Sequence, residues 1–453
     1  MREHPDRDPF VPVVRCAADL LAVVPHTLGY WPADSLVLFA AGGGTAGACV
    51  RVDLPADPDD ERFAEAFVTE LAELVGHDAL SDRVFAILYT PGGPEAPVPP
   101  TAPVGPVLAL VDEAARRAGR AVAARWVVAG SHWWPVEDPT DVRDVAGIQD
   151  SAVNVALVAA GSSYAAAPRL AMDHEYGALP AGTRRDVARQ AVRWARSGQG
   201  GWHHLDRLAP TLAVWEDVLS GVRDAPADWL PAVLAHDDDL LGFLAAGLSD
   251  PVLADLLLAA CATDDLTGVL AGASLWAQLC AEELVDADAA DDPTGPSCAP
   301  APPGAAPVPP RPRPAGPGGH PGPGAVRVPA PDAAELIRLS RVLAGEWDEV
   351  PAWSRLDALY RVLQALGWLL DPARTAGEGP GADPAAQSAV LAGVLVELAQ
   401  LNRFRARGSH TAHFVRRATA LVPGHPAALR VLRLADARPV PLWARDRATA
   451  WHC

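Results

Sequence analysis

Lysine is absent from the 453-residue chain, so every one of its 37 basic residues other than histidine is an arginine. This absence excludes chemistry that needs a lysine ammonium, such as a Schiff base or the phosphate-binding lysine of a Walker A loop. Cysteine is also scarce, because the six cysteines lie far apart and form no C-x-x-C pair. Such spacing indicates neither a disulfide framework nor a zinc knuckle and fits a reducing compartment. We therefore expect no metal site and no cofactor.

Long hydrophobic runs are missing as well. No stretch approaches the ~18 uninterrupted apolar residues of a membrane-spanning helix, and Asp255 interrupts the most apolar run, Val252 to Ala262. The first ten residues, MREHPDRDPF, mix both charges and lack the apolar region of a signal peptide. We therefore expect a soluble, cytoplasmic protein that does not interact with membranes.

The sequence nevertheless contains enough apolar residues, 50% of the total, to bury a core. Residues 10–160 combine the periodicities of strands and helices. Strands are predicted at 35–41, 48–54, 83–90 and 122–128, and helices at 17–28, 57–75, 107–118 and 150–160. Strands that alternate with helices predict an α/β layer, a mixed sheet with helices packed on it.

The rest of the chain is mostly helical in pattern, over residues 161–285 and again over 332–453. Predicted helices include 183–197, 267–284, 333–344 and 354–370. Between the two helical regions, about half of residues 286–331 are proline or glycine. A segment of this composition cannot bury enough apolar area to offset its ordering entropy, so we predict a disordered Pro/Gly-rich linker. The alternative is a proline-rich ligand for a signalling domain.

The segment AADLLAVVPHTLGYWPADSLVLFAA contains the most distinctive motifs: a short LL-x-x-VP helix, a Leu-Gly-aromatic turn, a Pro-x-Asp-Ser pair and a hydrophobic strand. The residues in these motifs are Leu20, Leu21, Val24, Pro25, Leu28, Gly29, Tyr30, Pro32, Asp34, Ser35, Leu36 and Val37. This pattern resembles the opening of an uncharacterised actinobacterial family, domain of unknown function 4192. The resemblance continues at Arg125 to Trp134, near Ala159, Gly161 and Arg169, and in RRATALVPGHPAALRVL. It implies no established activity.

One segment departs from the family pattern. Many relatives carry a cysteine-rich turn after the tryptophan pair, whereas this chain reads WWPVEDPTDVRDVAGIQ, with four acidic residues and no cysteine. A thiolate metal site is therefore absent here. A carboxylate site for a hard cation and a solvated acidic loop are the two alternatives. We expect the tryptophans of the chain mainly in the core and in helix contacts, although Trp133 and Trp134 in a turn could form an exposed binding surface.

Five residues after the first predicted helix are candidates for a ligand-binding site: His26, Tyr30, Trp31, Asp34 and Ser35. Histidine and aspartate titrate or form hydrogen bonds, serine donates or accepts, and the aromatic rings can stack on a planar ligand. The alternative is structural: Gly29 ends the helix in a left-handed conformation, the Asp-Ser pair forms a turn and the rings cover the sheet. A catalytic triad is less favoured, because no G-x-S-x-G motif surrounds any serine.

Positive charge is concentrated near the C-terminus. From Gln400 onward there are ten arginines and two acidic residues, although the whole chain has a formal charge of −19. Five of these arginines are candidates for binding an anionic partner: Arg403, Arg405, Arg407, Arg416 and Arg417. Because the chain as a whole repels nucleic acid, we favour docking onto acidic helices of the same chain or of a second copy.

These observations favour a non-enzymatic protein-interaction or regulatory protein whose partner is another protein or a second copy. One alternative is a small-molecule-binding enzyme, such as a hydrolase, that uses the turn from His26 to Ser35. A second alternative is a weak nucleic-acid binder that uses the C-terminal arginine cluster.

Overall fold

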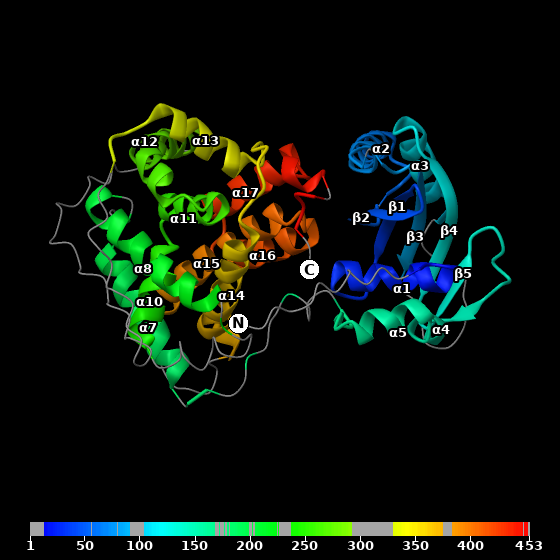
Figure 1. Cartoon of the computed structure of the whole chain (residues 1–453), viewed down its shortest axis with the longest axis horizontal. Helices are drawn as coiled ribbons and strands as arrows, with labels where there is room; N and C mark the ends of the chain where they lie inside the picture. The colour runs from blue at the N-terminus through cyan, green and yellow to red at the C-terminus, as the bar shows by residue number, and fades with distance from the viewer. Residues whose placement is uncertain are drawn as a thin grey trace, which may run out of the picture. The chain divides into compact units, whose positions relative to one another are not determined.

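The computed structural model describes most of the chain and divides it into two compact units, Met1–Asp173 and His174–Cys453. The described residues are 13–55, 57–78, 80–90, 104–167, 172, 176, 179–180, 182–198, 202, 204–223, 225, 237–291, 329–374, 383–446 and 448–451. Each unit is described by itself below. The predicted fold class is confirmed, because a mixed sheet with helices forms the first unit and helices form the second (Figure 1).

The first unit is built on a six-stranded sheet with the order β2-β1-β3-β4-β5-β6. The strands are β1 (Ser35–Gly42), β2 (Thr45–Asp53), β3 (Arg83–Thr90), β4 (Ala121–Ala129), β5 (His132–Pro135) and β6 (Arg143–Asp144). Only β3 and β4 pair in parallel, whereas the other neighbours are antiparallel. The parallel connection passes through helix α3, as a crossover requires.

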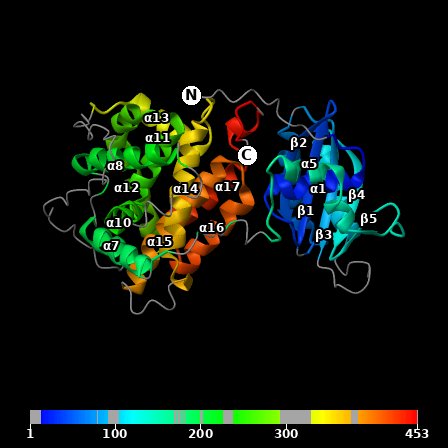
Figure 2. The same cartoon turned by 60° about the horizontal axis from the view of Figure 1, so that its bottom comes forward.

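Helices cover both faces of this sheet, as Figures 1 and 2 show. They are α1 (Ala17–Leu28), α2 (Glu61–Gly76), α3 (Val104–Arg117), α4 (Ala146–Gln149) and α5 (Ala152–Ala159). Because side chains alternate along a strand, Leu36 and Leu38 of β1 join the core beneath α2 and α3. Val37 and Phe39 join the opposite core beneath α1. The sheet is therefore the middle of three layers.

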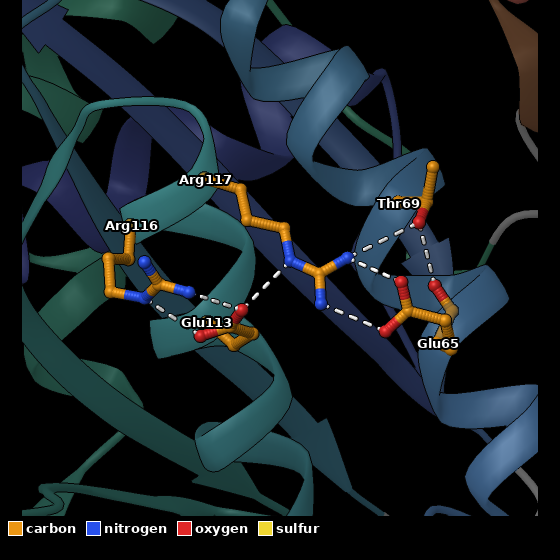
Figure 3. A network of polar contacts seen from close by, with 5 residues as sticks. All are labelled: Glu65, Thr69, Glu113, Arg116 and Arg117. Atoms are coloured by element: carbon orange, nitrogen blue, oxygen red, sulfur yellow. Dashed lines mark hydrogen bonds and ion pairs between the residues drawn. The ribbon is translucent and has the colours of Figure 1, made fainter.

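A network of arginine and glutamate side chains joins α2 to α3 on the surface (Figure 3). The Arg117 guanidinium donates to both carboxylate oxygens of Glu65, at 2.7 and 2.8 Å, and to Glu113 at 2.8 Å. Arg116 also donates to Glu113. These hydrogen bonds lower the pKa of Glu113 to about 2, with Arg116 as the largest cause.

Trp133 and Trp134 are core residues, as expected for most tryptophans of the chain, and the alternative of an exposed turn is wrong. Both lie in β5, and only 2% and 6% of their surfaces are exposed. Trp133 packs in the core beneath α1, and Trp134 packs in the core beneath α2 and α3. The strand is four residues long and is covered on both faces, so it lacks the alternation by which a half-buried strand is recognised.

The described part of the second unit consists of helices. They are α7 (Thr183–Gly198), α8 (Leu205–Arg223), α10 (Asp238–Gly247), α11 (Pro251–Thr263), α12 (Leu266–Asp291), α13 (Ala333–Ala344), α14 (Trp353–Leu370), α15 (Pro384–Phe404), α16 (Gly408–Leu421) and α17 (Pro426–Ala437). Short 3-10 helices lie at Pro372–Arg374 and Leu442–Ala444.

Helix α15 is central to the second unit, since it contacts α7, α10, α11, α14, α16 and α17. At Gly393 the backbone of α15 approaches the end of α10 so closely that an added Cβ would lie 2.4 Å from the Leu248 carbonyl oxygen. By length and composition α15 could cross a membrane, and 72% of its most apolar window is buried inside the unit, as in the core helix of a soluble protein. The bent pair formed by α10 and α11 passes the same test.

The chain on either side of the predicted linker meets again in the second unit. Helix α12 extends to Asp291, so the first residues of the predicted linker continue a helix. Residues 292–328 lie outside the described residues, and their disorder stays a prediction. After them, the Asp332 amide donates to the Ala271 carbonyl at 2.9 Å, and α13 packs against α11 and α12.

Candidate functional site at the junction of α1 and α5

The end of α1 brings distant parts of the first unit together. Gly29 adopts φ of 81° and donates its amide to the Pro25 carbonyl at 2.8 Å, which ends the helix as predicted. The next residues then pair with the chain that follows α5. The Trp31 amide donates to the Ala165 carbonyl at 2.8 Å, and the Ala165 amide donates to the Gly29 carbonyl at 3.0 Å. Two segments that are more than a hundred residues apart therefore share a short parallel bridge.

His26 in the last turn of α1 uses both of its ring nitrogens. Nδ1 lies 2.9 Å from the Ser162 hydroxyl, and Nε2 lies 3.0 Å from Oδ1 of Asn154 on α5. The Asn154 amide nitrogen donates to the Gln149 carbonyl at 2.6 Å, so its Oδ1 must accept from Nε2–H of His26. Nδ1 shares the second hydrogen bond of the ring with the Ser162 hydroxyl. His26 therefore fastens α5 to α1.

Aromatic rings surround this junction. Tyr164 meets the His26 ring edge-on at a centroid distance of 4.8 Å. Trp31 lies 6.2 Å from Tyr164 and 6.1 Å from Tyr89, perpendicular to the latter ring. Tyr30 is almost fully buried. Three of the predicted residues, His26, Tyr30 and Trp31, therefore lie at one junction.

The other two predicted residues point to a different set of partners. The Ser35 hydroxyl donates to the Ala33 carbonyl at 2.5 Å and accepts from Nε of Arg51 at 2.7 Å. Asp34 is exposed, with φ of 47°. Among the described residues, the hydrogen bonds of Ser35 and those of His26 share no partner. The structure thus does not join Ser35 to His26 as nucleophile and base.

Two further groups beside the junction are held in their neutral forms by burial. Burial raises the pKa of the Tyr89 phenol and raises the pKa of the Cys49 thiol to about 12. A thiol with such a pKa is a poor nucleophile near neutral pH. The Tyr89 hydroxyl is buried and has no hydrogen-bond partner in the described part of the chain.

Helix α5 presents apolar side chains to solvent. Ser151 caps its start by accepting from the Asn154 amide at 3.1 Å, and Val153 faces inward. Val155 and Val158 are 58% and 54% exposed, and Ala152 and Ala159 are exposed beside them. We call these four side chains the α5 face. On an ordinary surface helix this face would be polar.

The acidic side chains of the loop after the tryptophan pair all form local contacts. Glu137 accepts from Arg125 at 3.1 Å, and Asp141 pairs with Arg143 at 2.6 Å. Asp138 closes its own turn, and Asp144 accepts the Ala146 amide at 2.7 Å. No group of three or more His, Cys, Asp or Glu side chains in the described residues could hold a metal ion.

Comparison with known proteins identifies the family of this chain. Residues 18–291 match the family described as Domain of unknown function (DUF4192). This match covers more than half of the 453 residues. The chain belongs to this family. No curated protein and no solved structure matches it. The resemblance found at the start of the sequence is thereby confirmed, whereas the one at residues 416–432 lies beyond the matched part and stays a prediction.

The DUF4192 match includes the whole α1–α5 junction and extends through α12 of the second unit. Helices α13 to α17 follow the matched part and pack onto its helices, because α13 contacts α11 and α12, and α15 contacts α7, α10 and α11. The five candidate arginines all lie in this later part.

Most of these arginines are used within the second unit. Arg403 is 2% exposed and donates to the Leu343 and Ala344 carbonyls. Arg405 pairs with Asp357, Arg417 pairs with Asp371 at 3.1 Å, and Arg407 stacks on Trp451. Arg416 is exposed. The five guanidinium groups therefore do not form one surface patch.

Sequence reasoning missed the partners of His26, namely Asn154, Ser162 and Tyr164. Nothing in the spacing of these residues signals that α5 returns to α1. Two carboxyl groups in the second unit are buried, each 2% exposed: Asp255, which was noted only as an interruption of an apolar run, and Glu397, which was missed. An available signal was the single acidic residue within each apolar run.

Proposed function

We propose that this DUF4192 protein is a non-enzymatic interaction protein of the cytoplasm and that it binds another protein through the α5 face. The main observation that supports this proposal is the exposure of Val155 and Val158, at 58% and 54%, on a helix whose outer side has no charged residue. Apolar side chains that gather on one exposed face are typical of protein-binding surfaces.

The junction described above supports this proposal because it holds α5 in place. An eight-residue helix is too short to be stable in isolation. Here the Ser151 cap, the packing of Val153 and the hydrogen bond from His26 to Asn154 fix it against α1. In this proposal His26 is a positioning residue that keeps the α5 face ready for a partner. A preformed surface lowers the entropy lost on binding.

The test is site-specific photo-cross-linking in the cells that produce the protein. Benzoylphenylalanine is placed at Val155 and, as a matched control on the second unit, at Val350, which is 52% exposed. We expect one discrete protein adduct from position 155 that disappears when Val158→Asp is added. Because Val158 is exposed, this change should leave the fold intact. No adduct at position 155, or the same adducts from position 350, would contradict the proposal.

A second candidate function is supported by the Tyr89 hydroxyl. It is buried beside Trp31, near the end of β3, and has no partner among the residues that the structure describes. In α/β sheets, ligands bind at the carboxyl ends of parallel strands. A planar small molecule with an acceptor atom would satisfy this hydroxyl. A thermal-shift screen of metabolites on the wild type and on Tyr89→Phe checks this candidate, because such a ligand should stabilise only the wild type.

A further inference from the structure

A tryptophan near the C-terminus sits in a site made by two other parts of the second unit. Trp451 donates its indole Nε1–H to Oδ1 of Asp357 on α14, at 3.1 Å. The guanidinium carbons of Arg405 and Arg407 lie 4.7 and 4.3 Å from the centre of its ring. The indole ring thus stacks against two guanidinium groups, and its N–H group donates a hydrogen bond to the Asp357 carboxylate.

Arg405 is a buried residue of this site that several contacts hold in place. Its side chain is 3% exposed and pairs with Asp357, and its guanidinium carbon lies 4.0 Å from the centre of the Tyr360 ring. Burial is the main cause that lowers its pKa. Its Nε–H is buried and has no acceptor within the part of the chain that the structure describes. A buried donor without an acceptor is costly, so this N–H favours a ligand oxygen.

The backbone between the two arginines adopts an unusual conformation. Ala406 has φ of 55°, in the left-handed region that residues other than glycine rarely occupy. This conformation is strained for a residue with a Cβ atom. It turns the chain from α15 into α16, with Arg405 and Arg407 on either side of the turn. Strain of this kind concentrates at binding sites.

The segment that carries Trp451 is more deeply buried at its start than at its end. Trp443 is 2% exposed and donates to the Phe404 carbonyl at 2.8 Å. Farther along, Trp353 donates to the Thr449 carbonyl at 3.0 Å. Asp446 and Ala448 are exposed, and Trp451 is only half-buried. The side-chain contacts of Trp451 are separate from those of Trp443, so the loss of the former would leave Trp443 in the core.

We propose that Asp357, Tyr360, Arg405 and Arg407 form a binding site for a guanine base, and that Trp451 occupies this site within the same chain. Asp357 only accepts hydrogen bonds, so the ligand must present N–H donors on its edge. Guanine presents two adjacent donors, N1–H and N2–H, on a planar ring that stacks on guanidinium and aromatic side chains. The buried Nε–H of Arg405, which has no acceptor among the described residues, can donate to a phosphate oxygen of such a ligand.

The experiment measures binding of guanosine monophosphate to the full chain by calorimetry. Trp451→Ala empties the site, whereas Trp451→Phe keeps a ring over the guanidinium groups. We expect Trp451→Ala to bind at least about tenfold more tightly than the wild type, because an internal competitor lowers apparent affinity. Trp451→Phe should stay close to the wild type. Adenosine monophosphate should bind more weakly, since adenine N1 is an acceptor.

The site residues and the ligand source are tested separately. Adding Arg407→Ala to Trp451→Ala should remove the gain, and a single-stranded hexanucleotide with one guanine tests whether a strand binds better than the free nucleotide. If a folded Trp451→Ala protein shows no gain over the wild type, or if Arg407→Ala leaves the gain intact, the proposal is wrong.

A second measurement does not depend on the Trp451→Ala protein. In the wild type labelled with 5-fluorotryptophan, guanosine monophosphate should shift the fluorine resonance of Trp451. An unchanged resonance at saturating nucleotide would also overturn the proposal.

Discussion

Arg430 of α17 pairs with Asp255 of α11 at 2.6 Å inside the second unit, across 175 positions of the chain. Trp276 donates to the other oxygen of Asp255 at 3.3 Å. Asp255 belongs to the DUF4192 match and Arg430 follows it. The pair therefore joins the family domain to the helices that come after it, and its loss should loosen that packing.

Replacing Arg430 with methionine should destabilise the second unit strongly. The change leaves the Asp255 carboxyl buried without its cation, which typically costs about 3–5 kcal/mol. Urea unfolding followed by circular dichroism measures the loss. Arg433→Met on the exposed side of the same helix is the matched control and should change the midpoint little. Equal midpoints for the two variants would contradict the prediction.

Glu397 of α15 should make stability depend on pH. Burial raises the pKa of this carboxyl well above its usual value of 4.5, and the nearby Asp255 adds to the increase. Between 4.5 and the folded-state pKa, the folded protein holds a proton that the unfolded chain releases. Stability therefore falls as the pH rises through this window.

Replacing Glu397 with glutamine should remove this part of the pH dependence, because the amide does not titrate. The free energy of unfolding is measured by urea titration at several pH values from 5 upward. The matched control, Glu349→Gln, lies on the surface and should keep the wild-type slope. The same slope in Glu397→Gln as in the wild type would contradict this assignment.

Replacing His26 with alanine should release α5 from α1. The change removes the bonds to Asn154 and Ser162, each worth about 0.5–1.5 kcal/mol. Amide exchange of residues 152–159, followed by mass spectrometry, should become about tenfold faster or more. Thr27→Ala removes only a local bond to the Val23 carbonyl and serves as the control. Unchanged exchange in α5 would show that other contacts hold the helix.

Glu113 should titrate near pH 2. Its hydrogen bonds from Arg116 and Arg117 lower its pKa to about 2, so the charged form persists well below the usual range (Figure 3). A carbon-detected NMR titration of the Glu113 carboxyl measures this value directly. Arg116→Ala should raise it toward 4.5. Arg83→Ala, which removes the partner of Asp82, should leave it unchanged.

Local patterns in the sequence predicted much of the fold. The strand at 83–90 and the helices at 17–28 and 333–344 were predicted with the bounds that the structure has. In each case the periodicity of apolar residues and the flanking turn residues agree. Gly29 likewise predicted the left-handed end of α1. Such features depend on neighbouring residues and can be read without knowledge of the fold.

Features that depend on distant contacts were not predicted. The strands β5 and β6 are four and two residues long, too short for a clear pattern, so neither strand was predicted and an exposed turn at Trp133 and Trp134 stayed open as an alternative to burial. At the candidate site, the sequence grouped His26 with Ser35 because they are close along the chain. In the structure His26 bonds to Asn154 and Ser162 instead, since α5 folds back onto α1.

The return of the chain to α12 after residues 292–328 has a consequence for how this segment can vary. The Asp332 amide bonds to the Ala271 carbonyl near the start of α12, whereas the segment begins after the far end of that helix at Asp291, so it must span about 30 Å along α12. For a flexible tether, doubling its length adds only about 0.6 kcal/mol of closure entropy. Insertions and deletions should thus be tolerated there far better than in the loop of a few residues between α10 and α11.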